Sequence, residues 1–414
     1  MQDTVARPLA GLEVVECASF VAGPTGGMTL AQLGADVIRI DPVGGGSDHR
    51  RWPVVGDGTG GPEAESYYWA SLNKGKRSIA IDMRSDEGRE LVTALITAPG
   101  EHRGVLVDNV VGRGWMANDV LTARRPDLVH VRVQGYPDGR PAVDYTVNAE
   151  LGVPAMTGPE HSAAPVNHVL PAWDLVAGLT VSTGVLAALY ERSRTGRGTF
   201  VELALSDVAL AGVANLGWLS EAAERGTGRP RQGNHLYGTF GVDFACADGE
   251  RVMVVALTPG QWRAVCTATG TTDVFAALEP ALGVDLTDEA DRYRVRDTIE
   301  AVLKPWFAAR DSTTVHTALT GHRVLWGPYR GMAEVVAQHR AGAHPVLADA
   351  VLACGASAIT ARSPLRWNGD HGSAGEAPEL GRETDEVLAG RLGLSDAEIG
   401  ALRARGVVAG PDKS

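Results

Sequence analysis

Short apolar runs alternate with segments of helical periodicity along the first half of the chain. Four runs rich in apolar and β-branched residues have the length and composition of strands: 12–17, 35–40, 105–108 and 128–133. Helical spacing of apolar residues marks the segments 26–33, 85–97 and 116–124, and Ser85, followed by two acidic residues, is a helix-start signal. Strands and helices that alternate across short turns predict an α/β fold with a parallel, Rossmann-like sheet covered by helices.

The second half begins with the longest apolar segment of the chain. A helix is predicted from about 174 to 194, where basic residues and glycine mark its end. Further elements follow in order: a strand over 200–203, a helix over 206–224, two strands within 237–257 joined at a turn over 247–249, and helices over 259–268, 288–309, 313–320 and 395–405. The polar stretch 224–233 is the clearest boundary. It separates residues 1–224 from a small α+β unit over 225–320 and a tail over 321–414.

Composition narrows the class of protein. The 414 residues, 44% hydrophobic and 21% charged, predict two to three folded domains of about 150 residues each. A net charge of −12 argues against nucleic acid as the main partner. Residues 175–190 fall short of the about 20 apolar residues that a membrane helix needs, and the amino-terminal residues show no leader pattern. Four widely spaced cysteines indicate free thiols in a reducing cytoplasm and no zinc site.

Two segments have features of phosphate-binding sites. The sequence GPTGG at 23–27 follows the first strand and opens a helix, where backbone N–H groups could hold an anion; a plain tight turn is the alternative. The sequence NKGKR at 73–77 clusters three cations, which suits phosphate; a solvated surface turn is the alternative. The residues by themselves leave both questions open.

Asp174 stands at the start of the long apolar helix. An aspartate at this place commonly caps the helix, and the position alone favours that role. Held among apolar and small residues such as Trp173 and Gly178, the same carboxylate could instead attack an activated acyl group. The scattered histidines lack H-x-x-x-H spacing and no G-x-S-x-G motif occurs, so neither a metal site nor a serine hydrolase is predicted.

Motifs spread over nearly the whole chain resemble those of one enzyme family. They are PLAGLEVVE at 8–16, FVAGP at 20–24, LGADVIRI at 33–40, LNKGKRSI at 72–79, GVLAAL at 184–189, RTGRG at 194–198 and LGRETDEVL at 380–388. Taken together they resemble the family III CoA-transferases, also called the carnitine/bile-acid CoA-transferase family. The resemblance implies a large Rossmann-like domain built from both chain ends, residues 1–224 and 321–414. It also implies a smaller domain formed by residues 225–320, and an intertwined homodimer.

The resemblance also implies a chemistry and a set of site residues. Asp174 matches the family nucleophile, which would form an aspartyl–acyl anhydride and then an enzyme-bound CoA thioester. CoA would enter as part of the substrate, with no tightly bound cofactor. The positions that match CoA contacts of the family are Ser19, Phe20, Val21, Ala22, Ile81, Arg84, Asn109, Val110 and Arg113.

A narrower likeness points to one branch of the family. The supporting segments are GGMTLAQL at 26–33, DPVGGG at 41–46, RWPV at 51–54, DYTVN at 144–148, VNHVLPAWD at 166–174 and RPRQGN at 229–234. They resemble members that move CoA between the C1 and C4 carboxyls of mesaconyl-CoA within one molecule. A retained diacid needs a cation for its second carboxylate, and a lid that occludes the site. The candidate cations, each of which could equally be a surface charge, are Arg50, Arg51, His168 and Arg231.

Three alternatives stay open from the sequence. The first is an intermolecular family III transferase acting on another acyl group. The second is an acyl-CoA racemase, although the histidine of the racemases falls on Val143, which leaves two-base proton transfer without one base. The third is a non-catalytic CoA-binding protein.

Overall fold

The computed structural model describes residues 7–56, 64–110 and 114–410, and its largest element is a mixed sheet of order β12–β3–β2–β1–β4–β5–β6. All neighbouring strands in it run parallel except β12, which pairs antiparallel with β3. The strands are β1 (Glu13–Cys17), β2 (Asp36–Asp41), β3 (Arg77–Ile81), β4 (Val105–Asp108), β5 (Val129–Gln134), β6 (Thr199–Ala204) and β12 (Val408–Ala409). The predicted α/β class with a large parallel sheet is confirmed.

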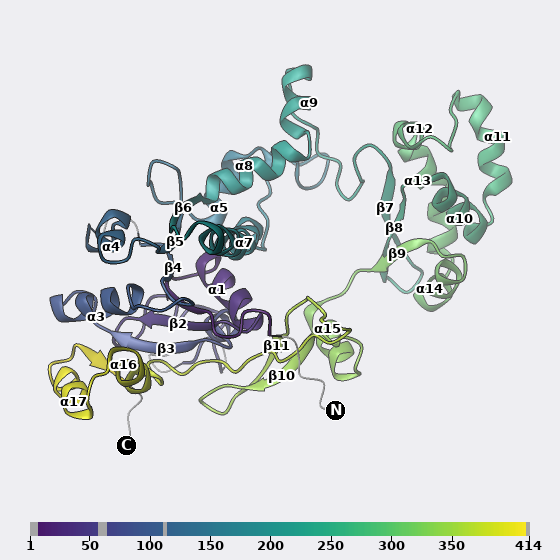
Figure 1. The fold of residues 1–414 in the computed structure, drawn as a ribbon. Coiled ribbons are helices and arrows are strands. Elements are labelled where there is room, and N and C mark those ends of the chain that lie inside the picture. The colour runs from purple at the N-terminus through teal and green to yellow at the C-terminus, as the bar shows by residue number, and fades with distance from the viewer. Residues whose placement is uncertain (1–6, 57–63, 111–113, 411–414) are drawn as a thin grey trace. The chain divides into compact units, whose positions relative to one another are not determined.

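Helices cover both faces of this sheet (Figure 1). Successive strand residues point to opposite faces, so Val15 joins one core cluster and Val14 the other. The first cluster packs under α3 (Asp86–Ile96), α4 (Asn118–Arg124), α16 (Thr384–Leu392) and α17 (Asp396–Ala404). The second packs under α1 (Ala22–Gln32), α5 (Asp144–Glu150), α7 (Ala172–Thr195) and α8 (Leu205–Asn215). Ser85 caps α3 by accepting a hydrogen bond from the Gly88 N–H, as its position predicted.

Glycines bring α1 and α7 into close contact. A Cβ on Gly26 would lie 2.5 Å from a methyl of Val181, and a Cβ on Gly178 would lie 2.5 Å from the side chain of Thr25. The GPTGG segment is therefore part of the buried first turns of a helix that starts at Ala22, so a plain tight turn is wrong, and anion binding at this helix start stays a prediction. Small residues stand here because the two helices touch, and this contact places the start of α7 beside the end of β1.

The basic segment 73–77 is buried rather than exposed. The Nζ atom of Lys76 lies 2.8 Å from a carboxylate oxygen of Glu16, and burial lowers the pKa of Lys76 to about 8. Arg77 pairs with Asp36 at the sheet edge. Lys74 is buried and donates to the Ser71 carbonyl oxygen. Neither the phosphate patch nor the solvated turn is correct, because all three cations already have partners within the chain.

A second compact unit has its own core. Its antiparallel sheet contains β7 (Phe240–Ala245), β8 (Arg251–Ala256) and β9 (Leu325–Pro328), and the predicted hairpin corresponds to β7 and β8. The rings of Phe244 and Phe307 stack 4.2 Å apart at its centre. Its helices are α6 (Val153–Met156), α10 (Pro259–Thr269), α11 (Thr272–Leu282), α12 (Glu289–Arg294), α13 (Arg296–Ala308), α14 (Ser312–Gly321) and α15 (Met332–Arg340). The predicted single helix over 288–309 is two helices that meet at Val295.

The chain divides between these two units as follows. The first consists of the described residues of Met1–Leu151, His168–Leu219 and Gly342–Ser414, and the second of Gly152–Asn167 and Ser220–Ala341. The division predicted from the sequence, at 224 and 320, stays a prediction. The predicted helix over 206–224 breaks at Gly217, which has a φ of +76°, into α8 and α9 (Trp218–Arg225). Several elements of the first unit have no counterpart in the sequence prediction, among them α2 (Tyr67–Asn73), α5, β10 (Leu347–Val351), β11 (Ser357–Ala361) and β12.

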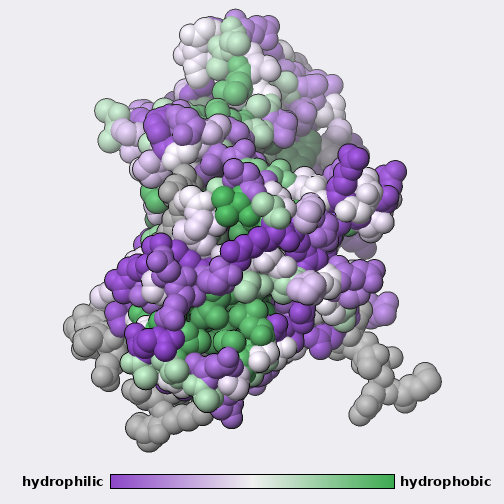
Figure 2. Space-filling view, turned by 60° about the vertical axis from the view of Figure 1, so that its left-hand side comes forward, coloured by the Kyte–Doolittle hydropathy of each residue, from purple (hydrophilic) through white to green (hydrophobic). Residues whose placement is uncertain are grey.

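The long helix α7 is longer than predicted. Its 24 residues are long and apolar enough to cross a membrane by length and composition, a test that core helices of water-soluble proteins also pass. It packs against α1 and β5 in the first unit. The predicted cytoplasmic location stays a prediction. A separate apolar groove, lined by residues such as Leu91, Leu394 and Leu402, lies on the side of the molecule that carries α3 and α17, where Figure 2 shows hydrophobic surface framed by hydrophilic residues.

Candidate active site

The candidate site lies at the topological switch point of the sheet, where the strands that follow β1 in the chain are placed first on one side of it and then on the other. The strand β1 stands between β2 and β4, and crevices at the carboxyl ends of such strands are the usual ligand sites of open α/β sheets. Residues 18–20, here called the switch-point loop, follow β1. Asn109 follows β4, accepts a hydrogen bond from the Ser19 N–H at 3.2 Å and donates one to the Ser19 carbonyl oxygen at 3.0 Å. This reciprocal pair joins the two strand ends.

A cavity of about 360 Å³ opens beside the switch-point loop. Asp174 lines it from the first turn of α7, opposite the start of α1. Other lining residues come from the end of β5 and the segment before α5: Val133, Gln134, Gly135, Gly139, Arg140, Pro141, Ala142 and Val143. A carboxylate therefore faces a hollow at the sheet edge where a ligand is expected.

Asp174 does not cap its own helix. The N-cap residue of α7 is Pro171, which offers no side-chain acceptor. The role falls to Asp144 of α5, whose Oδ2 accepts hydrogen bonds from the N–H groups of Trp173 at 2.7 Å and Asp174 at 3.1 Å. Its Oδ1 lies 2.5 Å from Nε2 of His168. Because another residue satisfies the helix start, the Asp174 carboxylate accepts no hydrogen bond within the described chain.

Burial and a neighbouring charge change the acidity of Asp174. Its pKa is raised from 3.8 to about 6, mainly by desolvation and also by the negative charge of Asp144, while the positive charge of Arg51 opposes the shift. The Arg51 guanidinium stands 5.5 Å from the ring centre of Phe20 and 5.4 Å from that of Tyr68. Burial raises the pKa of Tyr68 to about 12, so its phenol is protonated beside the carboxylate at neutral pH. The result is a poorly solvated carboxylate with one cation nearby, a suitable nucleophile for an acyl group.

Comparison with known proteins identifies the family. The model of CoA-transferase family III matches residues 9–384. The chain belongs to this family. This family III CoA-transferase is 50% identical to a 2-methylfumaryl-CoA isomerase of Chloroflexus aurantiacus, over 98% of this chain and 99% of that one. It is 30% identical to a succinyl-CoA:mesaconate CoA-transferase of Haloarcula hispanica, over 92% and 95% of the two chains.

A solved structure supports the same assignment. A CAIB/BAIF family protein from Brucella suis matches the CoA-transferase with a TM-score of 0.75 and 26% identity, covering 93% of this chain and 100% of that one. The family resemblance seen in the motifs is confirmed, and the chain is an enzyme of a family that acts on CoA substrates.

The structure brings six of the predicted site residues of the CoA-transferase together. Asp174 shares the cavity with Ser19, Phe20, Val21, Ala22 and Asn109. Arg51 stacks on one of these residues, and His168 holds the aspartate that caps α7.

The other predicted residues lie elsewhere or outside the description. Ile81 is fully buried in the core, and Val110 packs partly buried against the same cluster. Arg84 is exposed and pairs with Asp82. Arg50 is exposed on the glycine-rich segment and donates to the Gly44 carbonyl oxygen. Arg231 belongs to the second unit, where it donates to backbone carbonyls, and Arg113 lies outside the described residues.

Sequence reasoning missed three residues at this site: Asp144, Tyr68 and Asp48. Asp144 stood only as part of a family motif, although an aspartate just after a polar turn is itself a helix-start signal. The sequence around Tyr68 and Asp48 gives no sign of a role at the site, because the roles of these residues depend on contacts with residues far away in the sequence.

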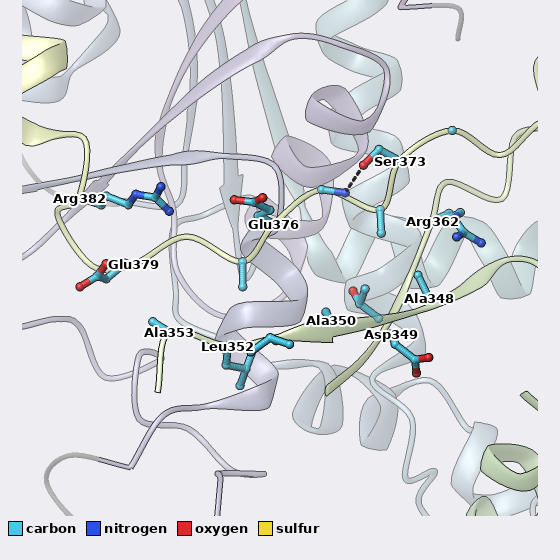
Figure 3. A pocket seen from close by; sticks show the side chains of 16 residues that line it. Ala348, Asp349, Ala350, Leu352, Ala353, Arg362, Ser373, Glu376, Glu379 and Arg382 are labelled. Carbon is cyan, nitrogen blue, oxygen red and sulfur yellow. Dashed lines mark hydrogen bonds between the residues drawn. The ribbon is translucent and has the colours of Figure 1, made fainter. Parts of the chain in front are cut away.

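Another cavity, of about 630 Å³, lies between β10 and the segment 372–382 (Figure 3). Both signs of charge line it, with Arg362 and Arg382 among Glu376, Glu379 and Asp349. None of the predicted site residues is among its lining residues. In the part of the chain that the structure describes, no group of three or more His, Cys, Asp or Glu residues is arranged to hold a metal ion.

Proposed function

We propose that this family III CoA-transferase moves CoA between the C1 and C4 carboxyls of mesaconyl-CoA, which is 2-methylfumaryl-CoA, with Asp174 as the nucleophile. The observation that carries the proposal is the Asp174 carboxylate, released from capping by Asp144 and facing the cavity at the switch-point loop. The 50% identity to a 2-methylfumaryl-CoA isomerase supports the substrate. Val143 lines the cavity where the racemases carry a histidine, which favours acyl transfer.

The proposed cycle uses two kinds of activated acyl group. The Asp174 carboxylate attacks the C1 thioester carbonyl and the C–S bond breaks, which leaves an aspartyl–mesaconyl anhydride and CoA thiolate. The thiolate attacks the aspartyl carbonyl, releases mesaconate and leaves an aspartyl–CoA thioester. The C4 carboxylate of the retained mesaconate attacks this thioester and expels the thiolate. The thiolate then attacks the C4 acyl carbon, which restores the Asp174 carboxylate.

Arg51 is the proposed partner of the second carboxylate of the diacid. Its positive charge is close enough to lower the pKa of Asp174, and its guanidinium contacts the aromatic rings of Phe20 and Tyr68. Arg50, His168 and Arg231 remain proposals from the resemblance, as do CoA contacts by Ile81, Arg84, Val110 and Arg113. A homodimer is also proposed, because α7 exposes Val176, Leu179, Leu186 and Tyr190 along one side.

Isotope retention tests the intramolecular reaction. Mesaconyl-C1-CoA is incubated with enzyme and an excess of ¹³C-labelled free mesaconate, and the C4 isomer is analysed by mass spectrometry. We expect the product to form without label, because the retained diacid returns in an effectively unimolecular step, equivalent to an effective concentration of about 10⁵ M or more. Succinyl-CoA with labelled mesaconate is the control for transfer between molecules. Label entering the C4 isomer at the rate of turnover would show an intermolecular transferase.

The pH profile tests the ionisation state of the nucleophile. Asp174, with a pKa near 6, attacks only as the carboxylate, so we expect kcat/KM to fall about tenfold per pH unit below 6 and to level off above it. Arg51→Gln removes the cation that lowers this pKa, so the midpoint should move to higher pH. Arg51→Lys, which keeps the charge, should leave the midpoint near that of the wild type. A midpoint that does not move in Arg51→Gln contradicts the assignment.

A further inference from the structure

A buried cluster of charges lies beneath the switch-point loop. Arg39, 1% exposed, donates hydrogen bonds to the carboxylates of Asp41 at 2.8 Å and Asp48 at 2.9 Å. The same guanidinium donates to the carbonyl oxygen of Ala18 at 2.8 Å. Asp48, also 1% exposed, accepts a hydrogen bond from the Phe20 N–H at 3.2 Å. Arg39 and Asp48 therefore hold the loop at its first and last residues.

The last residue of the loop has an unusual backbone conformation. Phe20 has a φ of +69°, a region that residues with a Cβ rarely adopt and that persists only where the surroundings impose it. Its ring carries the Arg51 guanidinium, and the residue lines the cavity together with Asp174. Its N–H donates to Asp48, while Asn109 donates to the carbonyl oxygen of the same peptide group, at Ser19.

Within the described residues, the Asp48 side chain accepts hydrogen bonds through only one of its two carboxylate oxygens. Its Oδ1 is buried and accepts no hydrogen bond within the described residues, while Oδ2 accepts from both Arg39 and Phe20. The nearby carboxylate of Asp41 also binds Arg39, but its second oxygen accepts from Ser78 in the sheet instead of from the loop. Two buried aspartates thus share one arginine, and only one of them contacts the loop.

We propose that Asp48 is a positioning residue of the transferase reaction, an inference that rests on the proposed function of Asp174. Anchored on Arg39, it holds Phe20 in the left-handed conformation, and Phe20 in turn supports the cavity wall and the Arg51 guanidinium that face the nucleophile. Displacement of a reacting group by about 1 Å can lower a rate by about 10²-fold. Asp48 acts on the reaction through Phe20, without touching the substrate.

Three variants of the full chain test this role: Asp48→Ala, Asp48→Asn and Asp41→Asn. We expect Asp48→Ala to lower kcat/KM about 30- to 100-fold per folded molecule, mainly through kcat, because Phe20 loses its acceptor. Asp48→Asn keeps an oxygen that can accept from the Phe20 N–H, so its loss should be about three- to tenfold. Asp41→Asn weakens the same arginine cluster without touching the loop, so it should lower the melting temperature and leave kcat/KM within about twofold.

The outcomes separate this proposal from the proposed function. Turnover of mesaconyl-CoA by the wild-type enzyme tests the proposed function, independently of any variant. The dissociation constant of CoA, measured by calorimetry for each variant, tests the role of Asp48 without depending on which acyl group is the substrate. Equal activity losses in Asp48→Ala and Asp41→Asn overturn the positioning role. If Asp48→Ala does not fold, Asp48→Asn is compared in the Phe20 and Phe20→Gly backgrounds. Glycine adopts a positive φ unaided, so the Asp48→Asn loss should shrink there, and an equal loss in both backgrounds also overturns the role.

Discussion

We expect the replacement of Asp174 by asparagine to abolish turnover. The amide has nearly the same shape but cannot form the anhydride, so we expect kcat to fall at least about 10⁴-fold, as in enzymes that lose a covalent nucleophile. Turnover is measured by separating the C1 and C4 thioesters by chromatography. In wild-type enzyme exposed to mesaconyl-CoA, hydroxylamine should convert residue 174 into a hydroxamate, located by peptide mass spectrometry.

Stability provides the control for this variant. Burial raises the pKa of Asp174 to about 6, so at pH 7.5 the folded protein holds an ionised carboxylate that is better solvated when the chain unfolds. Asp174→Asn removes that cost, and its melting temperature at pH 7.5 should equal or exceed that of the wild type. Full turnover by a folded Asp174→Asn variant, or a hydroxamate at another residue, would refute the proposed chemistry.

The second large effect is expected at Asp144. Asp144→Ala leaves the N–H groups of Trp173 and Asp174 without their acceptor and removes the carboxylate oxygen that lies 2.5 Å from Nε2 of His168. Loss of a helix cap costs about 1–2 kcal/mol of folding stability. Because the same residue holds the turn that carries the proposed nucleophile, kcat should also fall, by about 10²-fold. Chemical denaturation and steady-state kinetics measure the two effects separately.

Two further variants show whether the effect at Asp144 is specific. Asp144→Asn keeps an acceptor oxygen but removes the negative charge that raises the pKa of Asp174, so the acid limb of its pH profile should move to lower pH. Ser85→Ala removes the cap of α3, under the opposite face of the sheet. It should cost comparable stability with no change in kcat. If Ser85→Ala lowers kcat as much as Asp144→Ala does, the loss at Asp144 reflects general destabilisation.

The fold was largely predictable where local pattern and burial agree. The strands β1, β2, β4 and β5 lie within a residue or two of the predicted runs, because short runs rich in valine and isoleucine are a strong local strand signal even where they include buried charges such as Glu16 and Arg39. Helix boundaries were less predictable. The helix α1 starts at Ala22, and its glycines look like a turn until α7 is packed against them.

The sequence by itself determined the α/β class, the family membership carried by its motifs, and a short set of candidate residues that includes Asp174. Only the tertiary structure decided what Asp174 is available to do. A cap is a hydrogen bond that any well-placed oxygen can accept, and Asp144, 30 residues earlier, accepts it. In the same way, the sequence does not tell whether a cluster of lysine and arginine lies on the surface or forms buried ion pairs. The outcome depends on which carboxylates the fold places beside the cluster, as it places Glu16 beside Lys76. Periodicity reports which side of an element is buried, whereas partners and pKa values depend on distances between residues that the sequence keeps far apart.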